Sequence, residues 1–338
     1  MRRALVFLVV GSTVLATLAG AVGFYAACLW RSSAFAPPLV VEVQRGEPFL
    51  TLARRLAAAG AIANARLFTL LARYRGDDRR VRSGEYELAG NATGPAVLDF
   101  LVNGKQRLRL VTVPEGLTAE EIASIFERAG FGDAARFRAL GKDRDFLARL
   151  ELPVPRLEGY LFPDTYAFES GATPEEIVVR MTARFREMFT PDLAQAASDR
   201  GLTVDQAVTL ASIVEEEAAV ADERPTISAV FHNRLESGMP LQADPTVLYG
   251  VTGHDGRIRS ADLARATPYN TYVIPGLPPG PIANPGRASL EAAVRPAPGV
   301  TALYFVARND RTHEFNDTLA AHQKAVNRYQ RSPARKTN

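Results

Sequence analysis

The sequence has little of what several protein classes require. It holds one cysteine among 338 residues, which excludes a disulfide scaffold and a cysteine-cluster metal site. Its 40 basic and 37 acidic residues leave a net charge of +3 without a basic stripe, so the signature of a nucleic-acid-binding protein is absent. At 47% the apolar fraction is too high, and Gly and Pro are too few, for a disordered or collagen-like chain.

Two common catalytic motifs are also missing. The histidines show no H-E-x-x-H spacing, which makes a metallohydrolase a weak interpretation; they are His232, His254, His313 and His322. A serine hydrolase would need a G-x-S-x-G elbow, and the sequence has none. We therefore predict neither a metal ion nor another cofactor.

A long uncharged run stands out at the N-terminus. Residues 4–30 carry no charged side chain, and a helix of this length measures about 40 Å, enough to cross a hydrocarbon core of about 30 Å. Arg2 and Arg3 precede the run and favour a cytoplasmic N-terminus. We expect residues 1–31 to form a cytoplasmic tip and a single membrane anchor, with the rest of the chain outside the cytoplasm.

Two alternatives for this segment stay open. A cleaved signal peptide is one, although its apolar region normally spans only about 7–15 residues. Lipidation of Cys28 is the other, because Ala26 and Ala27 are small residues before a cysteine, but Tyr25 stands where such a signal usually has leucine. An unpaired cysteine at the membrane boundary is the simpler interpretation.

An internal repeat follows a proline-containing linker at 36–38. Seven residues recur 70 positions later without a gap: Val43, Gly46, Leu52, Ala53, Leu56, Ala59 and Gly60 recur as Val113, Gly116, Ile122, Ala123, Phe126, Ala129 and Gly130. The pattern predicts a strand, a glycine turn and an amphipathic helix ended by glycine in each copy. Thr118 and Glu121 form a predicted capping box in the second copy.

The first copy resembles a LysM-like module, a small βααβ fold that binds glycans containing N-acetylglucosamine. We assign it residues 39–105, with a second helix around 67–73, a strand at 84–88 and another helix near 95–103. Residues 106–134 are assigned to the second related repeat or connector. A packing module near the membrane is the alternative, because no sugar-binding constellation is visible in the sequence.

Residues 135–330 have a different pattern and are predicted to form a catalytic domain. It is mainly helical with small β elements: helices near 134–149, 174–189, 191–200, 204–220, 224–236, 287–294 and 317–329, and a strand at 302–307. The tail at 331–338 is polar and expected to be loose. The predicted fold class is therefore α+β, with an N-terminal transmembrane helix, a βααβ subdomain and a helical domain.

The stretch 204–221 places a carboxylate on an unexpected face. At about 100° per residue, Glu215 falls inside the apolar arc of this helix, whereas Glu216 lies well outside it and Glu217 near its edge. Burial disfavours an ionised carboxyl group, which suits a general acid working near neutral pH. A solvated acidic helix end is the alternative, and Arg224 could offset the effect of burial.

Polar and aromatic groups gather downstream of this helix. A long loop at 268–286 contains six prolines, so it is expected to be stiff, and a loop this long is more often functional than idle. Amides pair with sugar hydroxyl and acetamido groups, and aromatic faces stack on pyranose rings. The candidates for positioning sugars are Gln242, Asp244, Tyr249, Asn270, Tyr272 and Asn284. Glu158 is a rival for an acidic role, with pinning of the loop that follows it as the alternative.

Five blocks in order make a family resemblance specific. They are LEGYLFPDTY at 157–166, LASIVEEE at 210–217, LQADPTVLYG at 241–250, YNTY at 269–272 and GLPPGPIANPG at 276–286. Together they resemble the signature blocks of the YceG-like family of endolytic murein transglycosylases.

The resemblance implies a single-pass protein of the bacterial inner membrane with a periplasmic catalytic domain. Such enzymes cut peptidoglycan glycan strands between N-acetylmuramic acid and N-acetylglucosamine, leave 1,6-anhydro ends, and are thought to work beside peptidoglycan synthases. The implied catalytic residue is Glu215, the residue that the helical wheel also selects; the family often has lysine where this sequence has Glu216. The alternative function is a non-catalytic peptidoglycan-binding scaffold.

Overall fold

The computed structural model describes residues 2–31, 38–44, 46–88, 90 and 92–331, the side chains of 2–9 and 331 excepted. Most of the predicted linker at 36–38 and of the predicted tail at 331–338 lies outside these residues. The chain forms two compact units, Met1–Leu110 with Ala167–Ala172, and Val111–Tyr166 with Thr173–Asn338. Each unit is described by itself.

The N-terminal helix α1 spans Arg2–Trp30. Its segment Val10–Trp30 has a mean hydropathy of 1.7 and is long and apolar enough to cross a membrane. None of that window is buried in protein, as expected for a span that faces lipid. Cys28 lies near its end and is half-buried. A membrane anchor and a signal sequence both satisfy this test.

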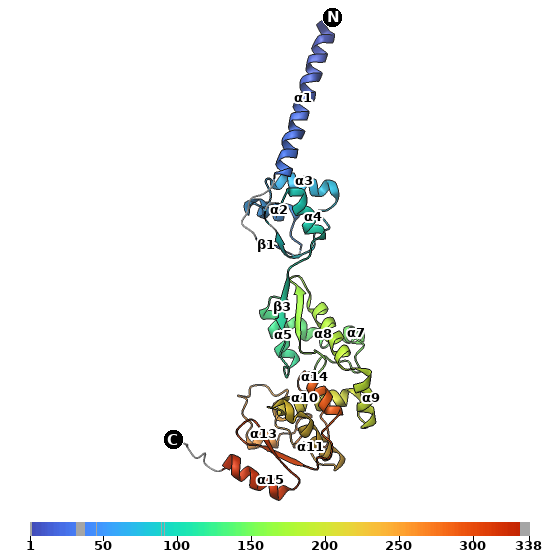
Figure 1. The fold of residues 1–338 in the computed structure, drawn as a ribbon, viewed down its shortest axis with the longest axis vertical. Helices are drawn as coiled ribbons and strands as arrows, with labels where there is room; N and C mark the ends of the chain where they lie inside the picture. The colour runs from blue at the N-terminus through green and yellow to red at the C-terminus, as the bar shows by residue number, and fades with distance from the viewer. Residues whose placement is uncertain (1, 32–37, 45, 89, 91, 332–338) are drawn as a thin grey trace, which may run out of the picture. The chain divides into compact units, whose positions relative to one another are not determined.

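The first copy of the repeat is a strand–helix–helix–strand unit followed by a helix. Its elements are β1 (Leu39–Val43), α2 (Phe49–Ala58), α3 (Ala65–Arg75), β2 (Gly84–Leu88) and α4 (Gly94–Asn103). The strands β1 and β2 are antiparallel, with Leu39 opposite Leu88 and Val43 opposite Gly84. The apolar faces of the helices and strands meet in one core around Leu56, Phe68 and Tyr86, and Figure 1 shows the unit in blue to cyan.

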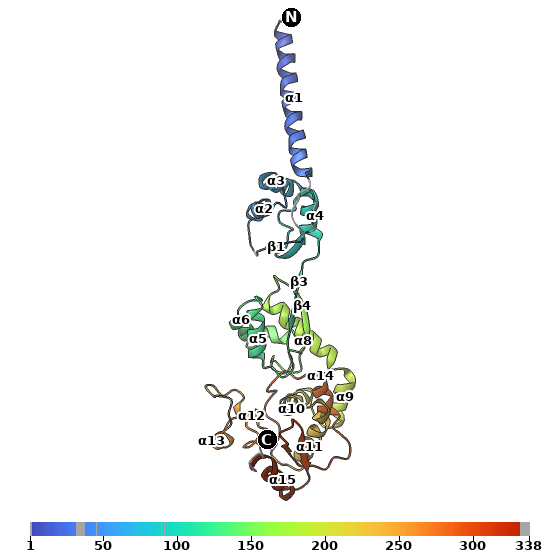
Figure 2. The ribbon, with the colours of Figure 1, turned by 60° about the vertical axis from the view of Figure 1, so that its left-hand side comes forward.

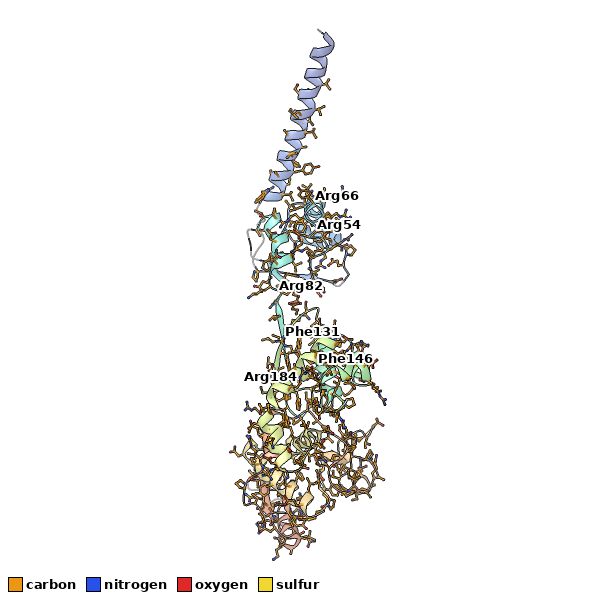
Figure 3. All side chains as sticks on the ribbon, turned by 90° about the vertical axis from the view of Figure 1, so that its right-hand side faces the viewer. Arg54, Arg66, Arg82, Phe131, Phe146 and Arg184 are labelled. Carbon is orange, nitrogen blue, oxygen red and sulfur yellow. The ribbon has the colours of Figure 1, made fainter. Side chains whose placement is uncertain are left out.

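The second copy has the same order of elements with an insertion. It consists of β3 (Leu108–Thr112), α5 (Ala119–Arg128), α6 (Ala134–Leu140), α7 (Arg144–Ala148), β4 (Thr165–Glu169) and α8 (Pro174–Met188). Strand β3 pairs with β4. Phe131 and Phe146, labelled in Figure 3, are buried in this copy. The repeat thus continues beyond residue 134, where we expected it to end, because the inserted α7 and the loop before β4 break the offset of 70.

The two copies end their first helix in the same way. The Ala61 N–H donates to Leu56 O at 2.8 Å, and the Phe131 N–H donates to Phe126 O at 2.9 Å, 70 positions later. Gly60 and Gly130 precede these donors with φ angles of +75° and +81°, which favour glycine. The repeat predicted from seven matching residues is therefore also a repeat of backbone geometry.

The remaining elements surround a central helix. They are α9 (Pro191–Asp199), α10 (Val204–Glu217), a 3₁₀ turn (Ala221–Glu223), α11 (Arg224–Glu236), α12 (Pro245–Leu248), α13 (Ser260–Leu263), α14 (Arg287–Val294), β5 (Tyr304–Ala307), β6 (His313–Asn316), α15 (Leu319–Val326) and a π-helical turn (Asn327–Arg331). Helix α10 packs against α9, α11 and α14 (Figure 2).

Three expectations about the helices and strands need correction. The helix predicted near 134–149 is two helices, α6 and α7, because the chain turns at Gly141 and Asp143 caps the second one through the Phe146 N–H. The strand β6 was not predicted, since its sequence HEFN lacks a hydrophobic alternation. Helix α10 is also more enclosed than a one-sided apolar arc suggests, because all residues from Ala207 to Val214 are buried.

Candidate active site

The Glu215 carboxylate lies at the end of the buried stretch of α10 and has two partners. Its side chain is 6% exposed, so its predicted burial is confirmed. Oε1 accepts a hydrogen bond from Arg224 Nη2 at 2.8 Å, and Oε2 accepts the Gly286 N–H at 2.9 Å. A guanidinium and a backbone N–H are the partners that an ionised carboxylate prefers. The structure therefore places Arg224 directly on Glu215, and it counters the effect of burial.

A second carboxylate, Glu115, lies beside this pair. Its Oε2 is 3.8 Å from Arg224 Nη2, so the guanidinium faces both acids. A Cβ at Gly286 would lie 1.9 Å from Glu115 Oε1, so any larger residue at this position would displace the carboxylate. Burial, and then the charge of Glu215, raise the pKa of Glu115.

The turn between β3 and α5 brings Glu115 to the site. Gly116, with φ +81°, forms this turn, and its N–H donates to Asn284 O at 3.0 Å while the Asn284 N–H donates to Leu117 O at 2.9 Å. A Cβ at Gly116 would lie 2.8 Å from Glu216 Oε1 and 3.8 Å from Glu215 Cγ. The turn is thus clamped to the proline-rich loop and packs directly on the last turn of α10.

A cleft of about 880 Å³ opens next to these residues. It is lined by the β3–α5 turn, by α12 and by the segment after it: Glu115, Gly116, Leu117, Thr118, Glu120, Glu121, Glu158, Glu216, Pro245, Leu248, Tyr249, Gly250, Val251, His254 and Ile282. Glu215 is not among these lining residues, but its neighbours Glu115, Gly116 and Glu216 are. The volume falls within the range of ligand-binding clefts, about 300–1,000 Å³.

Glu158 lines the cleft and connects three segments of the chain by hydrogen bonds. Its Oε1 accepts the Ala119 N–H and Asn284 Nδ2, each at 2.9 Å, and its Oε2 accepts the Tyr249 hydroxyl at 3.0 Å. Burial raises the pKa of Glu158 to about 7, and the three hydrogen bonds oppose that shift. Glu158 therefore pins the start of α5 and the proline-rich loop, whereas pinning of its own following loop was the alternative.

The three consecutive glutamates of α10 have three separate environments. Glu215 pairs with Arg224, Glu216 faces the cleft, and Glu217 Oε1 accepts the Asp244 N–H at 3.1 Å. Burial raises the pKa of Glu216 to about 7 and that of Glu217 to about 8. Steps of about 100° around the helix explain why neighbours in sequence diverge in space.

The other predicted sugar-positioning residues divide between two places. Tyr249 lines the cleft with Glu158. Gln242, Asp244 and Tyr272 instead line a second cavity of about 310 Å³, where the Tyr272 hydroxyl donates to Asp244 Oδ1 at 2.6 Å. The sequence alone did not separate the two groups.

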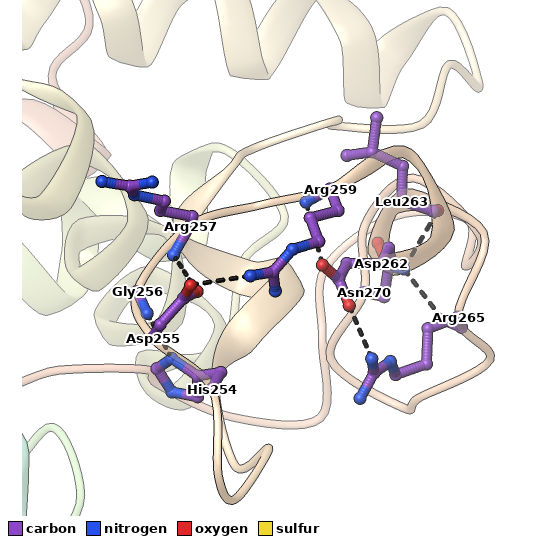
Figure 4. Close-up of polar contacts among 9 residues, drawn as sticks. All are labelled: His254, Asp255, Gly256, Arg257, Arg259, Asp262, Leu263, Arg265 and Asn270. Atoms are coloured by element: carbon purple, nitrogen blue, oxygen red, sulfur yellow. Dashed lines mark hydrogen bonds and ion pairs between the residues drawn. The ribbon is translucent and has the colours of Figure 1, made fainter.

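Asn270 and Asn284 are fully buried, and their side-chain amides are engaged inside the protein. Asn270 Nδ2 donates to the carbonyl oxygens of Asp262, Leu263 and Arg265, which holds the loop drawn in Figure 4. Asn284 Nδ2 donates to Leu117 O and Glu158 Oε1, and its Oδ1 accepts the Leu161 N–H. Both side chains shape loops, and neither presents its amide to a ligand.

Comparison with known proteins decides the family. The model of the YceG-like family matches residues 41–328. The chain is 31% identical over 304 residues to the endolytic murein transglycosylase of Bacillus subtilis, with 86% of this chain and 84% of that protein covered. The chain belongs to the YceG-like family.

Further relatives agree with this YceG-like assignment. The endolytic murein transglycosylase of Streptococcus pneumoniae D39 is 30% identical over 302 residues, which cover 80% of this chain and 54% of that longer protein. The crystal structure of a yceG-like protein from Listeria monocytogenes matches with a TM-score of 0.59 at 30% identity, over 85% of this chain and 98% of that one. The predicted family resemblance is confirmed.

Sequence reasoning missed two residues of this YceG-like chain. Glu115 was overlooked because it lies in the repeat, 100 positions before Glu215 in the sequence. Arg234, which lines the second cavity, was overlooked because a single arginine on a helix carries no signal. Among the described residues, no cluster of three or more His, Cys, Asp or Glu side chains has a metal-binding arrangement.

Proposed function

We propose that this protein is an endolytic murein transglycosylase with Glu215 as its single catalytic acid and base. The observation that carries the proposal is a buried glutamate, held by Arg224 and by the Gly286 N–H, whose neighbours Glu115 and Glu216 line a cleft of about 880 Å³. Family membership supports the same reaction, since the relatives are named for it.

Glu215 performs both proton transfers. In its protonated form it donates to the glycosidic oxygen between N-acetylmuramic acid and N-acetylglucosamine, and the bond from that oxygen to C1 of the muramic acid breaks. The 6-hydroxyl oxygen of the same muramic acid bonds to C1, and its proton passes to the Glu215 carboxylate. The product carries a 1,6-anhydro end, no water is consumed, and no second carboxylate is required.

Arg224 and Glu115 prepare Glu215 for this exchange. Arg224 Nη2 lies 2.8 Å from Glu215 and 3.8 Å from Glu115, so one guanidinium serves two carboxylates. When Glu215 takes up a proton, Glu115 remains as the counter-charge of Arg224. When Glu215 is ionised, the guanidinium and the Gly286 N–H stabilise it as the acceptor for the next proton.

The glycan binds in the cleft, and the residues that shape the loops act indirectly, by keeping the cleft walls in place. Glu158 and Tyr249 line the cleft, whereas Asn270 and Asn284 keep the loops in place. In this proposal α1 anchors the chain in the inner membrane with the catalytic part in the periplasm. The LysM-like copy binds the glycan, and peptidoglycan synthases are the partners that supply strands.

The decisive experiment replaces Glu215 with glutamine, which keeps the shape of the side chain and removes its proton. Because general acid–base catalysis contributes about 10²–10⁴-fold, we expect Glu215→Gln to lose the release of anhydro-ended fragments from purified murein by at least about 100-fold. Circular dichroism should show an unchanged fold.

Glu216→Gln is the matched control, because Glu216 lies next in the helix but faces the cleft rather than Arg224. We expect a far milder loss for this variant. Full activity of Glu215→Gln would overturn the catalytic assignment. A wild-type protein that binds murein without cutting it would favour the non-catalytic scaffold.

A further inference from the structure

A second cavity in the catalytic unit has no part in the proposed proton transfers. It measures about 310 Å³ and lies between the last turn of α10, helix α11, strand β5 and helix α15. Polar groups from α10, α11 and α15 line it, namely Glu217, Arg234 and His322, together with Asp244 from the segment before α12. Because Glu216 lines the cleft and Glu217 lines this cavity, the two spaces lie on different sides of the same helical turn.

The cavity contains a buried cation without an acidic partner. Arg234 is only 6% exposed, and among the described residues no carboxylate lies within ion-pair distance of it. Its Nε donates to Leu303 O at 2.6 Å and its Nη1 to Leu241 O at 2.6 Å. Carbonyl oxygens fix the guanidinium in place, while the Glu217 carboxyl and the Tyr304 ring, at 5.3 Å, interact with its charge without forming a close ion pair. Buried charges in proteins are normally paired, so this arrangement indicates a missing anion.

Two further features of the cavity are unusual: one buried nitrogen lacks a hydrogen-bond partner among the described residues, and one residue other than glycine has a left-handed backbone. The Nδ1 atom of His322 is buried without a hydrogen bond in the structure, while its ring stacks on Tyr304 at 5.3 Å. Gln242 holds a left-handed backbone conformation, with φ +50°, at the cavity wall. Strain of this kind in a residue other than glycine clusters at ligand sites.

We propose that this cavity binds a carboxylate of the peptide stem that murein carries on its muramic acid, with Arg234 and His322 as the binding residues. The proposal rests on the proposed function, which supplies a peptide-bearing glycan to the adjoining cleft. It assigns Gln242, Asp244 and Tyr272 to the stem rather than to the sugar. The cavity lies at the lower end of ligand-site volumes, which suits one small side group better than a further length of glycan.

The charges around the cavity favour a singly charged anion over a multiply charged one. One guanidinium offers a single positive charge, while Asp244, which accepts the Tyr272 hydroxyl, and Glu217 place carboxyl groups at the wall. Burial, and then the charge of Asp244, raise the pKa of Glu217 to about 8, so this carboxyl is protonated near neutral pH. His313 is occupied by Glu223, at 2.7 Å between Nδ1 and Oε2. A phosphate or pyrophosphate, such as a lipid carrier brings, would be repelled by Asp244 more strongly than a single carboxylate.

The experiment measures binding of a free murein tetrapeptide to the full-length protein in detergent by calorimetry. The second ligand is the same peptide with its carboxylates converted to amides. We expect the acid to bind at least about tenfold more tightly than the amide, because a charged hydrogen bond is lost in the amide. His322→Ala and Arg234→Lys should each weaken binding of the acid and leave the amide unchanged, with Arg308→Lys, an exposed arginine on the same unit, as the control.

Equal binding of acid and amide, absence of binding, or unchanged affinity in His322→Ala would overturn the proposal. His322 lies near the surface, so its variant remains informative if Arg234→Lys fails to fold. Inorganic pyrophosphate is the third ligand, and its tighter binding would show that the cavity takes a phosphate instead. Glu215→Gln should lose cleavage and keep tetrapeptide binding, which separates a failure of this inference from a failure of the proposed function.

Discussion

The two copies of the repeat share one local structure and differ in what surrounds it. In the first copy nothing lies within 4 Å of a Cβ placed on Gly46 in the turn before α2. In the second copy the same position, Gly116, would place a Cβ 2.8 Å from Glu216 Oε1, and the preceding residue, Glu115, faces Arg224. The same turn is therefore an open surface in one copy and a wall of the candidate active site in the other.

The insertion in the second copy accounts for part of this difference. The first copy passes from α3 to β2 through a short loop, whereas the second adds α7 and the segment that carries Glu158 before β4. Glu158 then holds the Ala119 N–H at the start of α5. A repeat unit can thus keep its core and gain a catalytic role through its turn and one inserted loop.

The largest expected effect comes from emptying the core of each copy. Phe126→Ala removes a fully buried ring that stacks on Phe137 at 5.7 Å, and we expect it to cost about 3–5 kcal/mol. Leu56→Ala, at the matching position, should cost about 2–5 kcal/mol in the first copy. Hydrogen exchange should localise each loss to its own copy; Phe126→Ala should lose murein cleavage, whereas Leu56→Ala should weaken murein binding and keep turnover at saturating murein. Equal loss of cleavage in both variants would show that the first copy is also needed for catalysis.

A smaller effect is expected from the paired glycine turns. Gly46→Ala and Gly116→Ala place a methyl group at φ +76° and +81°, so each turn should lose about 1 kcal/mol of stability. At Gly116 the methyl group also displaces the Glu216 carboxylate, which packs next to Glu215, and a small misplacement at a catalytic site is costly, so kcat/KM should fall by up to about tenfold. The assay is release of anhydro-ended fragments. An equal loss of kcat/KM in Gly46→Ala and Gly116→Ala would contradict this comparison of the two turns.

The smallest effect is expected for Glu115→Gln. Without this negative charge Arg224 loses its second carboxylate partner, so proton transfer at Glu215 is less well compensated and kcat should fall a few-fold. The assay is release of anhydro-ended fragments from purified murein. Glu120→Gln, at the outer cleft wall, is the control, and an unchanged kcat in Glu115→Gln would contradict the relation.

Much of the fold could be predicted because local signals agree with it. Capping boxes at Thr118, Thr173 and Thr203 start helices where the sequence places them. The repeat is visible because both copies need glycine at two left-handed positions and apolar residues on one helix face. The second copy was cut short at residue 134, since an insertion destroys the offset on which recognition depends. The strand β6 was not predicted because it forms by pairing with β5, and its own residues carry no strand pattern.

The candidate site was only partly visible in the sequence. Glu215 could be selected, because a carboxylate at the end of a buried helical stretch conflicts with its surroundings unless something compensates for it. The identity of that compensation, Arg224 with the Gly286 N–H, depends on how α10, α11 and the proline-rich loop meet. The residues predicted to bind sugar were selected by residue type alone. Residue type does not reveal that the Asn270 and Asn284 amides donate to acceptors inside the protein, or that Gln242 lines the second cavity.

The three directions of Glu215, Glu216 and Glu217 make helix α10 intolerant of any change in its length. Inserting or deleting one residue after the Thr203 cap would rotate the helix end by about 100°. Each carboxylate would then lie in the environment that its neighbour in the sequence now has. A single substitution along this stretch changes one side chain. A change in helix length would instead misplace three groups at once: the proposed proton-transfer residue Glu215, Glu216 at the cleft wall and Glu217 at the wall of the second cavity. Over evolution, we expect the spacing between the cap and the glutamates to vary less than the residues that fill it.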